Sequence, residues 1–129
     1  MNKREIFKRL TDLIPMLETV NEDTVHEIML KVHKTYFNVI DDNEAELEKY
    51  DIYNYHKRID EMMKKYNLSK DRELYFISPE KLDFKDTIFL FSLTMSMARW
   101  DDGEGIEYMI MNGCMIGWLR RLDELCEEE

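Results

Sequence analysis

The sequence has few of the residues that interrupt helices. It contains two prolines and four glycines among 129 residues, while 36% of the residues are charged and 44% are hydrophobic. Sheets joined by many tight turns use far more glycine and proline than this. The composition is therefore typical of an α-rich protein, and the length suits one compact domain. We expect a single helical domain over residues 1–129.

Cysteine is also scarce, and no apolar run is long. Cys114 and Cys126 are the two cysteines, and on a continuous helix they lie roughly 18 Å apart, too far for a disulfide. The apolar run over residues 88–97 has only about half of the ~20 residues that a membrane-spanning helix needs. The first five residues do not resemble a signal peptide. These features predict a soluble, reduced, cytoplasmic protein without membrane contact.

Positive charge is in deficit. The chain carries 18 Lys and Arg residues against 28 Asp and Glu residues, a formal net charge of −10. The phosphate backbones of nucleic acids repel such a chain unless a basic face neutralises them. The basic residues here are interleaved with acidic ones. Direct nucleic-acid binding is therefore disfavoured, whereas a basic protein partner, or simple solubility, is compatible with this charge.

Patterns that indicate catalysis are missing. The sequence has no phosphate-binding loop and no dinucleotide fingerprint. His26, His33 and His56 have no further ligand at a spacing that would complete a metal site. Ser92 and Ser96 have no base near them in the sequence. We therefore predict no catalytic residue, no cofactor and no metal, and we favour a function other than catalysis.

What the sequence does contain is an apolar C-terminal segment with all four glycines, at residues 87–126. Residues 84–100 are predicted to form a central helix that is buried on most sides. Its polar residues fall on one narrow stripe at spacings of seven, four and three: Lys85, Ser92, Ser96 and Arg99. Asp83 is placed to cap its N-terminus. The alternation of apolar and polar residues over 91–97 leaves a half-buried strand as the alternative.

The remaining periodicity completes an all-α prediction. Gly103 and Gly113 indicate helix ends, followed by a short helix and by a final helix from Cys114. Apolar stripes predict earlier helices within residues 3–18, broken near Pro15, and at 25–40 and 44–67, the last interrupted around 51–54. Residues 74–77 are the one β-like piece. We expect five or six helices packed around the 84–100 helix.

The C-terminal third resembles a family of small bacterial proteins classed as a domain of unknown function. The resemblance is carried by residues 99–103 (RWDDG), 112–113 (NG) and 118–122 (WLRRL), and residues 14–17 (IPML) are similar to the family's opening helix. Because the family has no established activity, the resemblance implies no catalytic role. It does imply that Arg99 and Asp102 are more than incidental.

Two hypotheses for Arg99 follow. In the structural one, its guanidinium binds the last helix carbonyls and the carboxylate of Asp101 or Asp102, which locks the corner at Gly103. In the functional one, Arg99 faces an anionic ligand or partner group.

For the whole chain we predict a small acidic protein-binding module, with a mobile element as one origin, that binds a protein partner or forms a homodimer. The alternatives are a nucleic-acid mimic that inhibits a DNA- or RNA-binding protein, and a small-ligand protein or enzyme with a pocket around Arg99, Ser92 and Ser96.

Overall fold

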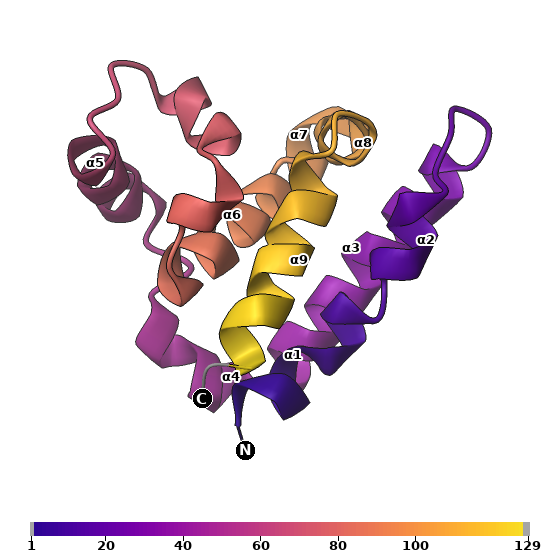
Figure 1. Cartoon of the computed structure of the whole chain (residues 1–129), viewed down its shortest axis with the longest axis horizontal. Coiled ribbons are helices and arrows are strands. Elements are labelled where there is room, and N and C mark those ends of the chain that lie inside the picture. The colour runs from indigo at the N-terminus through magenta and orange to yellow at the C-terminus, as the bar shows by residue number, and fades with distance from the viewer. Residues whose placement is uncertain (1, 128–129) are drawn as a thin grey trace.

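The computed structural model describes residues 2–127, except for the side chains of Arg99 and Trp100. Over this range the regular structure is entirely helical, which confirms the all-α prediction (Figure 1). The elements are α1 (Lys3–Thr11), α2 (Ile14–Glu18), α3 (Val25–Asp42), α4 (Glu44–Leu47), η1 (Glu48–Tyr50), α5 (Tyr55–Lys65), η2 (Asp71–Phe76), η3 (Pro79–Lys81), α6 (Phe84–Ser96), α7 (Ala98–Asp101), α8 (Glu104–Met111) and α9 (Cys114–Glu127), where η denotes a 3₁₀ helix.

The predicted number of five or six helices is too low for the described residues, because several helices are short. Pro15 lacks a backbone N–H and is accepted only in the first turn of α2, so α1 has already ended at Thr11. Asn43 separates α3 from α4. The interruption predicted around residues 51–54 is confirmed, since α5 begins at Tyr55.

The central helix α6 is shorter than the predicted 84–100. It ends at Ser96, and Met97 forms a turn before α7. Near this end the hydroxyls of Thr94 and Ser96 donate to the carbonyls of Leu90 and Leu93 at 2.9 and 2.6 Å, and such local bonds bend helices. The strand alternative is wrong. The predicted cap at Asp83 is confirmed, because its Oδ1 accepts from the backbone N–H of Asp86 at 2.8 Å.

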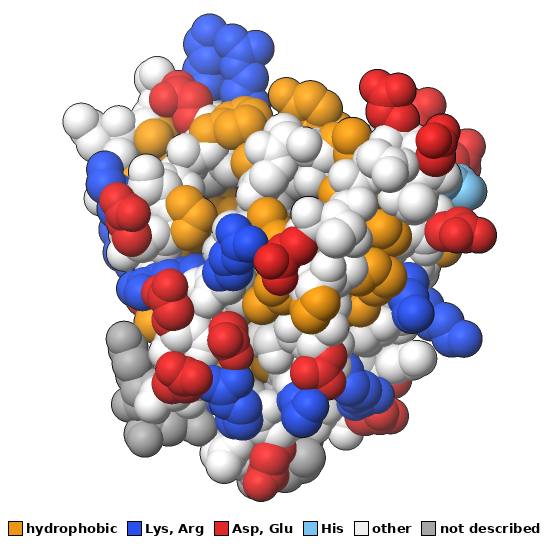
Figure 2. Space-filling view, turned by 45° about the vertical axis from the view of Figure 1, so that its right-hand side comes forward, with side chains coloured by type: hydrophobic (Ala, Val, Ile, Leu, Met, Phe, Trp, Pro, Cys, Tyr) orange, Lys and Arg blue, Asp and Glu red, His pale blue; other side chains and the backbone are white. Residues whose placement is uncertain are grey.

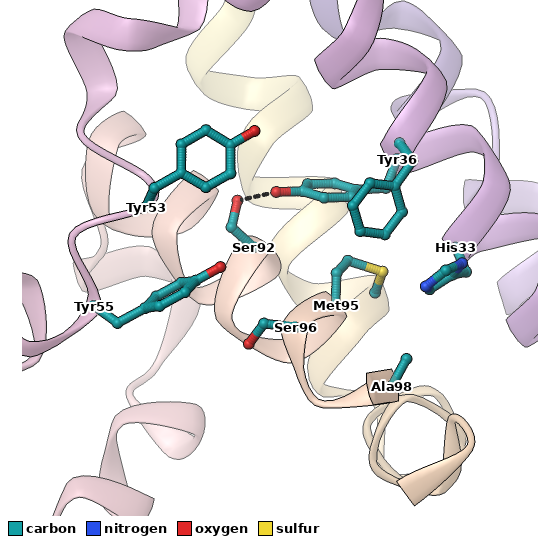
Figure 3. Close-up of a pocket in the computed structure, with 9 residues that line it drawn as sticks. His33, Tyr36, Tyr53, Tyr55, Ser92, Met95, Ser96 and Ala98 are labelled. Atoms are coloured by element: carbon teal, nitrogen blue, oxygen red, sulfur yellow. Dashed lines mark hydrogen bonds between the residues drawn. The ribbon is translucent and has the colours of Figure 1, made fainter. Parts of the chain in front are cut away.

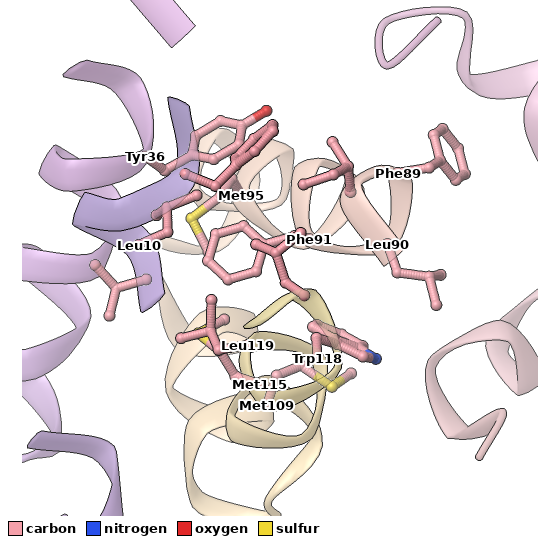
Figure 4. Close-up of a cluster of buried hydrophobic side chains, with 14 of the residues drawn as sticks. Leu10, Tyr36, Phe89, Leu90, Phe91, Met95, Met109, Met115, Trp118 and Leu119 are labelled. Atoms are coloured by element: carbon pink, nitrogen blue, oxygen red, sulfur yellow. The ribbon is translucent and has the colours of Figure 1, made fainter. Parts of the chain in front are cut away.

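The last helix, α9, shares the centre of the molecule with α6. It contacts α1, α2, α6, α8 and η3, and in Figure 1 it passes, in yellow, between the α1–α3 side and α6. Figure 4 shows Phe91 and Met95 of α6 lying between Tyr36 of α3 and Leu119 of α9. The core is therefore built on the α6–α9 pair rather than on α6 alone.

The two predicted glycine corners are both present. Gly103 and Gly113 have φ values of 88° and 85°, a region that disfavours side chains. At Gly103 a Cβ would also come within 2.7 Å of the Met29 side chain. The β-like prediction for residues 74–77 is wrong, because most of this stretch belongs to the 3₁₀ helix η2, anchored by buried Leu74.

Helix α5 is joined to α6 by buried charges. Arg58 of α5 contacts the Asp86 carboxylate with a 2.7 Å Nη2–Oδ1 distance, and Lys65 and Tyr66 reach the other oxygen at 2.7 and 2.6 Å. The Arg58 guanidinium also lies 5.1 Å from the centre of the Phe89 ring. These contacts, from Arg58 near the start of α5 and from Lys65 and Tyr66 at its end, hold the helix and with it Tyr55 against α6.

Candidate functional site

A cleft of about 820 Å³ opens between α3, α6 and the segment that leads into α5. Its volume lies within the ~300–1,000 Å³ typical of ligand sites. Three stretches far apart in the sequence supply the walls, and the lining residues are His33, Tyr36, Phe37, Tyr53, Tyr55, Ser92, Met95, Ser96 and Ala98. Figure 3 shows these side chains around the shared space.

The floor of the cleft is a hydrogen bond between α3 and α6. The hydroxyl of Tyr36 donates to Ser92 Oγ at 2.6 Å, and the two residues are only 4% and 1% exposed. Rings of Phe37 and Phe91 lie 5.0 and 5.7 Å from the Tyr36 ring and fix its position. Burial raises the pKa of Tyr36 well above its ordinary value of 10.0, so the phenol stays protonated.

One wall comes from the connection between η1 and α5. Asp51 has a φ of 54°, a left-handed conformation that aspartate tolerates, and it reverses the chain after η1. Ile52 is then buried, and the side chain of the next residue, Tyr53, is 60% exposed. Figure 3 shows the hydroxyls of Tyr53 and Tyr55 pointing into the cleft, on the side of Ser92. A tight turn anchored by one apolar residue thus presents two phenols.

The opposite rim belongs to α3. Phe37 is 40% exposed, and the His33 ring lies one helical turn earlier with its centre 4.7 Å from that of Phe37. Because α3 is continuous, residues four apart lie on the same face. The rim is therefore aromatic on both sides of the cleft.

Acidic groups lie close to the Tyr53 wall. Burial raises the pKa of Tyr53, and the nearby charges of Tyr55, Glu44 and Asp41 raise it further. The two carboxylates therefore place negative potential beside the phenol. Among the lining residues that the structure describes there is no lysine or arginine.

The cleft brings together two of the four predicted site residues, Ser92 and Ser96. Asp102 caps α7 in a left-handed conformation with an exposed side chain, and it is not among the described lining residues. Arg99 belongs to α7, next to the lining residue Ala98, but its side chain lies outside the described residues. The Arg99–Asp102 lock therefore stays a prediction.

The described contacts at the Gly103 corner come from Asp101. Its Oδ1 accepts from the N–H of Gly103 and its Oδ2 from the N–H of Gly105, both at 3.0 Å. A carboxylate that binds two backbone donors stabilises the turn between α7 and α8. The sequence indicated Asp101 as a possible counter-ion of Arg99, but these two hydrogen bonds were not predicted from it.

Sequence reasoning also missed the aromatic residues of the cleft. Tyr50, Tyr53 and Tyr55 fall within six residues, in a stretch of mediocre helix propensity. That local concentration of tyrosine between two helices was the available signal. Tyr36 carried none, because it lies on the apolar stripe of α3 and only its distant partner, Ser92, makes it part of a site.

The described residues give little indication of other classes of site. In the part of the chain that the structure describes, no group of three or more His, Cys, Asp or Glu residues is arranged to hold a metal ion. None of the described helices combines the length and the apolar character required to cross a membrane. Comparison of the chain with protein-family models, with curated proteins and with solved structures gives no match.

Proposed function

We propose that this protein is a protein-binding module and that the aromatic cleft is its binding surface. The observation that carries the proposal is the pair of exposed rings on the rim, Tyr53 at 60% and Phe37 at 40%. Aromatic side chains are enriched at the energetic centres of protein interfaces. A partner that covers these rings removes apolar surface from water while the buried floor remains unchanged.

The shape of α3 favours a protein over a small molecule. Leu30 precedes Phe37 by seven residues on the same continuous helix, so the two share a face, and Leu30 is also exposed. A small ligand inside the cleft would leave Leu30 in water. A protein segment that lies along α3 would cover both residues.

The hydroxyls of the cleft favour binding over catalysis. Ser92 Oγ accepts its hydrogen bond from a phenol whose pKa is raised by burial, and such a phenol is not a general base at neutral pH. Ser96 donates to the Leu93 carbonyl of its own helix. Among the described contacts, His33 makes no hydrogen bond to either serine.

On one face of the molecule, the distribution of charge supports a protein partner over nucleic-acid mimicry. A mimic needs carboxylates spread over one face at phosphate-like spacing. On the face drawn in Figure 2, acidic and basic side chains are interspersed over the lower half, and acidic groups gather at one upper corner.

Cytoplasmic location is part of the proposal, since Cys114 and Cys126 are both thiols.

Site-specific photo-crosslinking tests the proposal. A benzophenone amino acid replaces Tyr53 or, as a control of similar exposure on α8, Tyr108, which is 58% exposed. In lysate from cells that produce the protein, we expect a crosslinked protein from position 53 and not from position 108, and we expect Phe37→Ser to abolish it. Equal labelling at both positions, or none at position 53, would overturn the proposal.

A further inference from the structure

Resting on the proposed function, we infer a more specific occupant: the cleft takes a lysine or arginine side chain from a basic segment of the partner protein. The inference depends on three properties of the cleft that point to the same chemistry. They are its aromatic rings, its converging hydroxyl oxygens and the sign of the charge around it.

The rings provide faces for a cation. Tyr36, Phe37, Tyr53 and Tyr55 all line the cleft. Tyr36 is only 4% exposed, whereas Phe37 and Tyr53 are 40% and 60% exposed. The π-electrons of exposed rings attract ammonium and guanidinium groups. The chain already uses this contact elsewhere, since the Arg58 guanidinium lies 5.1 Å from the centre of the Phe89 ring. The cleft supplies aromatic rings at the surface, and a cation from the partner would complete the same kind of contact.

The hydroxyl oxygens provide acceptors. Lysine and arginine side chains carry only donors, so their heads need oxygen atoms around them. In Figure 3 the phenolic oxygens of Tyr53 and Tyr55 point into the cleft from one side, and the hydroxyl of Ser96, which is partly exposed, lies on the α6 side. Ala98 adds a partly exposed apolar surface that suits the aliphatic stem of a long basic side chain.

The described charges around the cleft favour a cationic occupant over an anionic one. Asp41 and Glu44 are close enough to Tyr53 to act on its hydroxyl, and the whole chain has a net charge of −10. Lys57, the first basic residue after Tyr55, is held by Asp51 at 3.2 Å. An anionic occupant would meet negative potential here and, among the described lining residues, no lysine or arginine.

Synthetic peptides provide the test. Fluorescence polarisation compares short peptides that share a glycine–serine frame and differ only in carrying arginine or lysine, glutamine, or glutamate. We expect the basic peptides to bind at least about fivefold more tightly than the glutamine peptide, with the glutamate peptide weakest. Affinity should fall as salt is added.

Variants of the protein test whether the basic peptide binds in the cleft. Tyr53→Ala should weaken binding of the basic peptide by about fivefold, while Tyr53→Phe retains the ring and most of the affinity. Tyr108→Ala is the matched control and should leave it unchanged. Removing the two acids together, with Asp41→Asn and Glu44→Gln, should weaken it by about threefold.

The same change of charge at a distant loop, with Glu22→Gln and Asp23→Asn, is the control for the acidic pair and should have no comparable effect. Circular dichroism melts of every variant report whether the fold is intact. An equal loss of affinity for the basic peptide from both double substitutions would overturn the inference. The electrostatic attraction would then come from the whole chain rather than from the acids beside the cleft.

The two proposals fail in different ways. If the glutamine or glutamate peptide binds as tightly as the basic ones, the cationic occupant is wrong, while crosslinking from position 53 still supports a protein partner. If position 53 crosslinks no protein, the proposed function is wrong whatever the peptides do.

Discussion

Arg58 on α5 and Asp86 on α6 form an ion pair with a 2.7 Å Nη2–Oδ1 distance, although their side chains are only 4% and 3% exposed. Buried charges are costly unless their hydrogen-bonding atoms are satisfied. Asp86 meets this condition, because Lys65 and Tyr66 donate to its Oδ2. Arg58 meets it less completely, since its Nε is buried with no hydrogen-bond partner. The pair therefore positions α5 at an energetic cost.

Removing one member of this pair is expected to be strongly destabilising. Arg58→Ala leaves the Asp86 carboxylate buried with fewer donors, so the free energy of unfolding should fall by about 3–5 kcal/mol in urea denaturation. Lys57→Ala, which removes a neighbouring exposed ion pair, should cost less than about 1 kcal/mol. Similar losses from the two substitutions would show that the buried pair has no special role.

Asp86 should also make stability depend on pH in acid. Burial opposes its ionisation, but hydrogen bonds from Lys65, Tyr66 and Arg58 outweigh burial and lower the pKa of Asp86 below 3.8. Because the unfolded state then binds more protons, this contribution is complete above about pH 4–5 and is lost as pH falls through the folded pKa.

Urea denaturation at a series of pH values measures the effect. The difference in unfolding free energy between the wild type and Asp86→Asn should shrink between about pH 5 and pH 2. A difference that stays constant over this range would mean that Asp86 is not the titrating group.

The effects of substituting Tyr36 and Ser92, which form the hydrogen bond at the floor of the cleft, on the free energy of unfolding should be coupled. Tyr36→Phe and Ser92→Ala should each reduce the free energy of unfolding by about 0.5–1.5 kcal/mol, because each leaves a buried partner unsatisfied. The double variant should lose less than the sum, since no unsatisfied group remains. Simple additivity in urea melts would indicate that the two hydroxyls do not depend on each other.

The corner between α7 and α8 should depend on Asp101. Asp101→Ala removes the acceptor of two backbone N–H groups, and we expect a loss of about 1–2 kcal/mol in thermal or urea melts. Asp102→Asn is the control, because asparagine also tolerates the left-handed conformation.

The same measurement on Arg99→Ala, Asp102→Ala and the double variant tests the predicted lock between Arg99 and Asp102. Single effects below about 0.5 kcal/mol that simply add would contradict that lock.

The two thiols should differ in reactivity. Cys114 is partly exposed, and burial raises the pKa of its thiol, whereas Cys126 is only 4% exposed. In a thiol titration of the native protein at neutral pH, we expect one thiol to react slowly and the second to react only after denaturation. A count below two in denatured, non-reduced monomer would contradict the thiol assignment.

Much of the fold was predictable because the relevant signals are local. The start of the last helix at Cys114, the stripe over residues 25–40 and the Asp83 cap depend on residues within one or two turns of each other. The exact end of α6 was not predicted, because hydroxyl bonds such as that of Ser96 to Leu93 compete with a helical pattern that continues in the sequence.

The candidate site was only half predictable. Ser92 and Ser96 were identified from the polar stripe of α6, and a pocket around them and Arg99 was one of the predicted alternatives. Their aromatic partners come from α3 and from the turn before α5. No spacing within one helix connects these three segments.

The sequence by itself determined where helices form, where glycine ends them and the net charge of −10, since periodicity, capping and composition act over short distances. Only the tertiary structure decided that Asp86 is buried, against the usual preference of aspartate, while Tyr53 is exposed. Burial depends on which distant residues pack alongside: Arg58, 28 residues away, makes a buried carboxylate tolerable, and buried Ile52 turns Tyr53 outward.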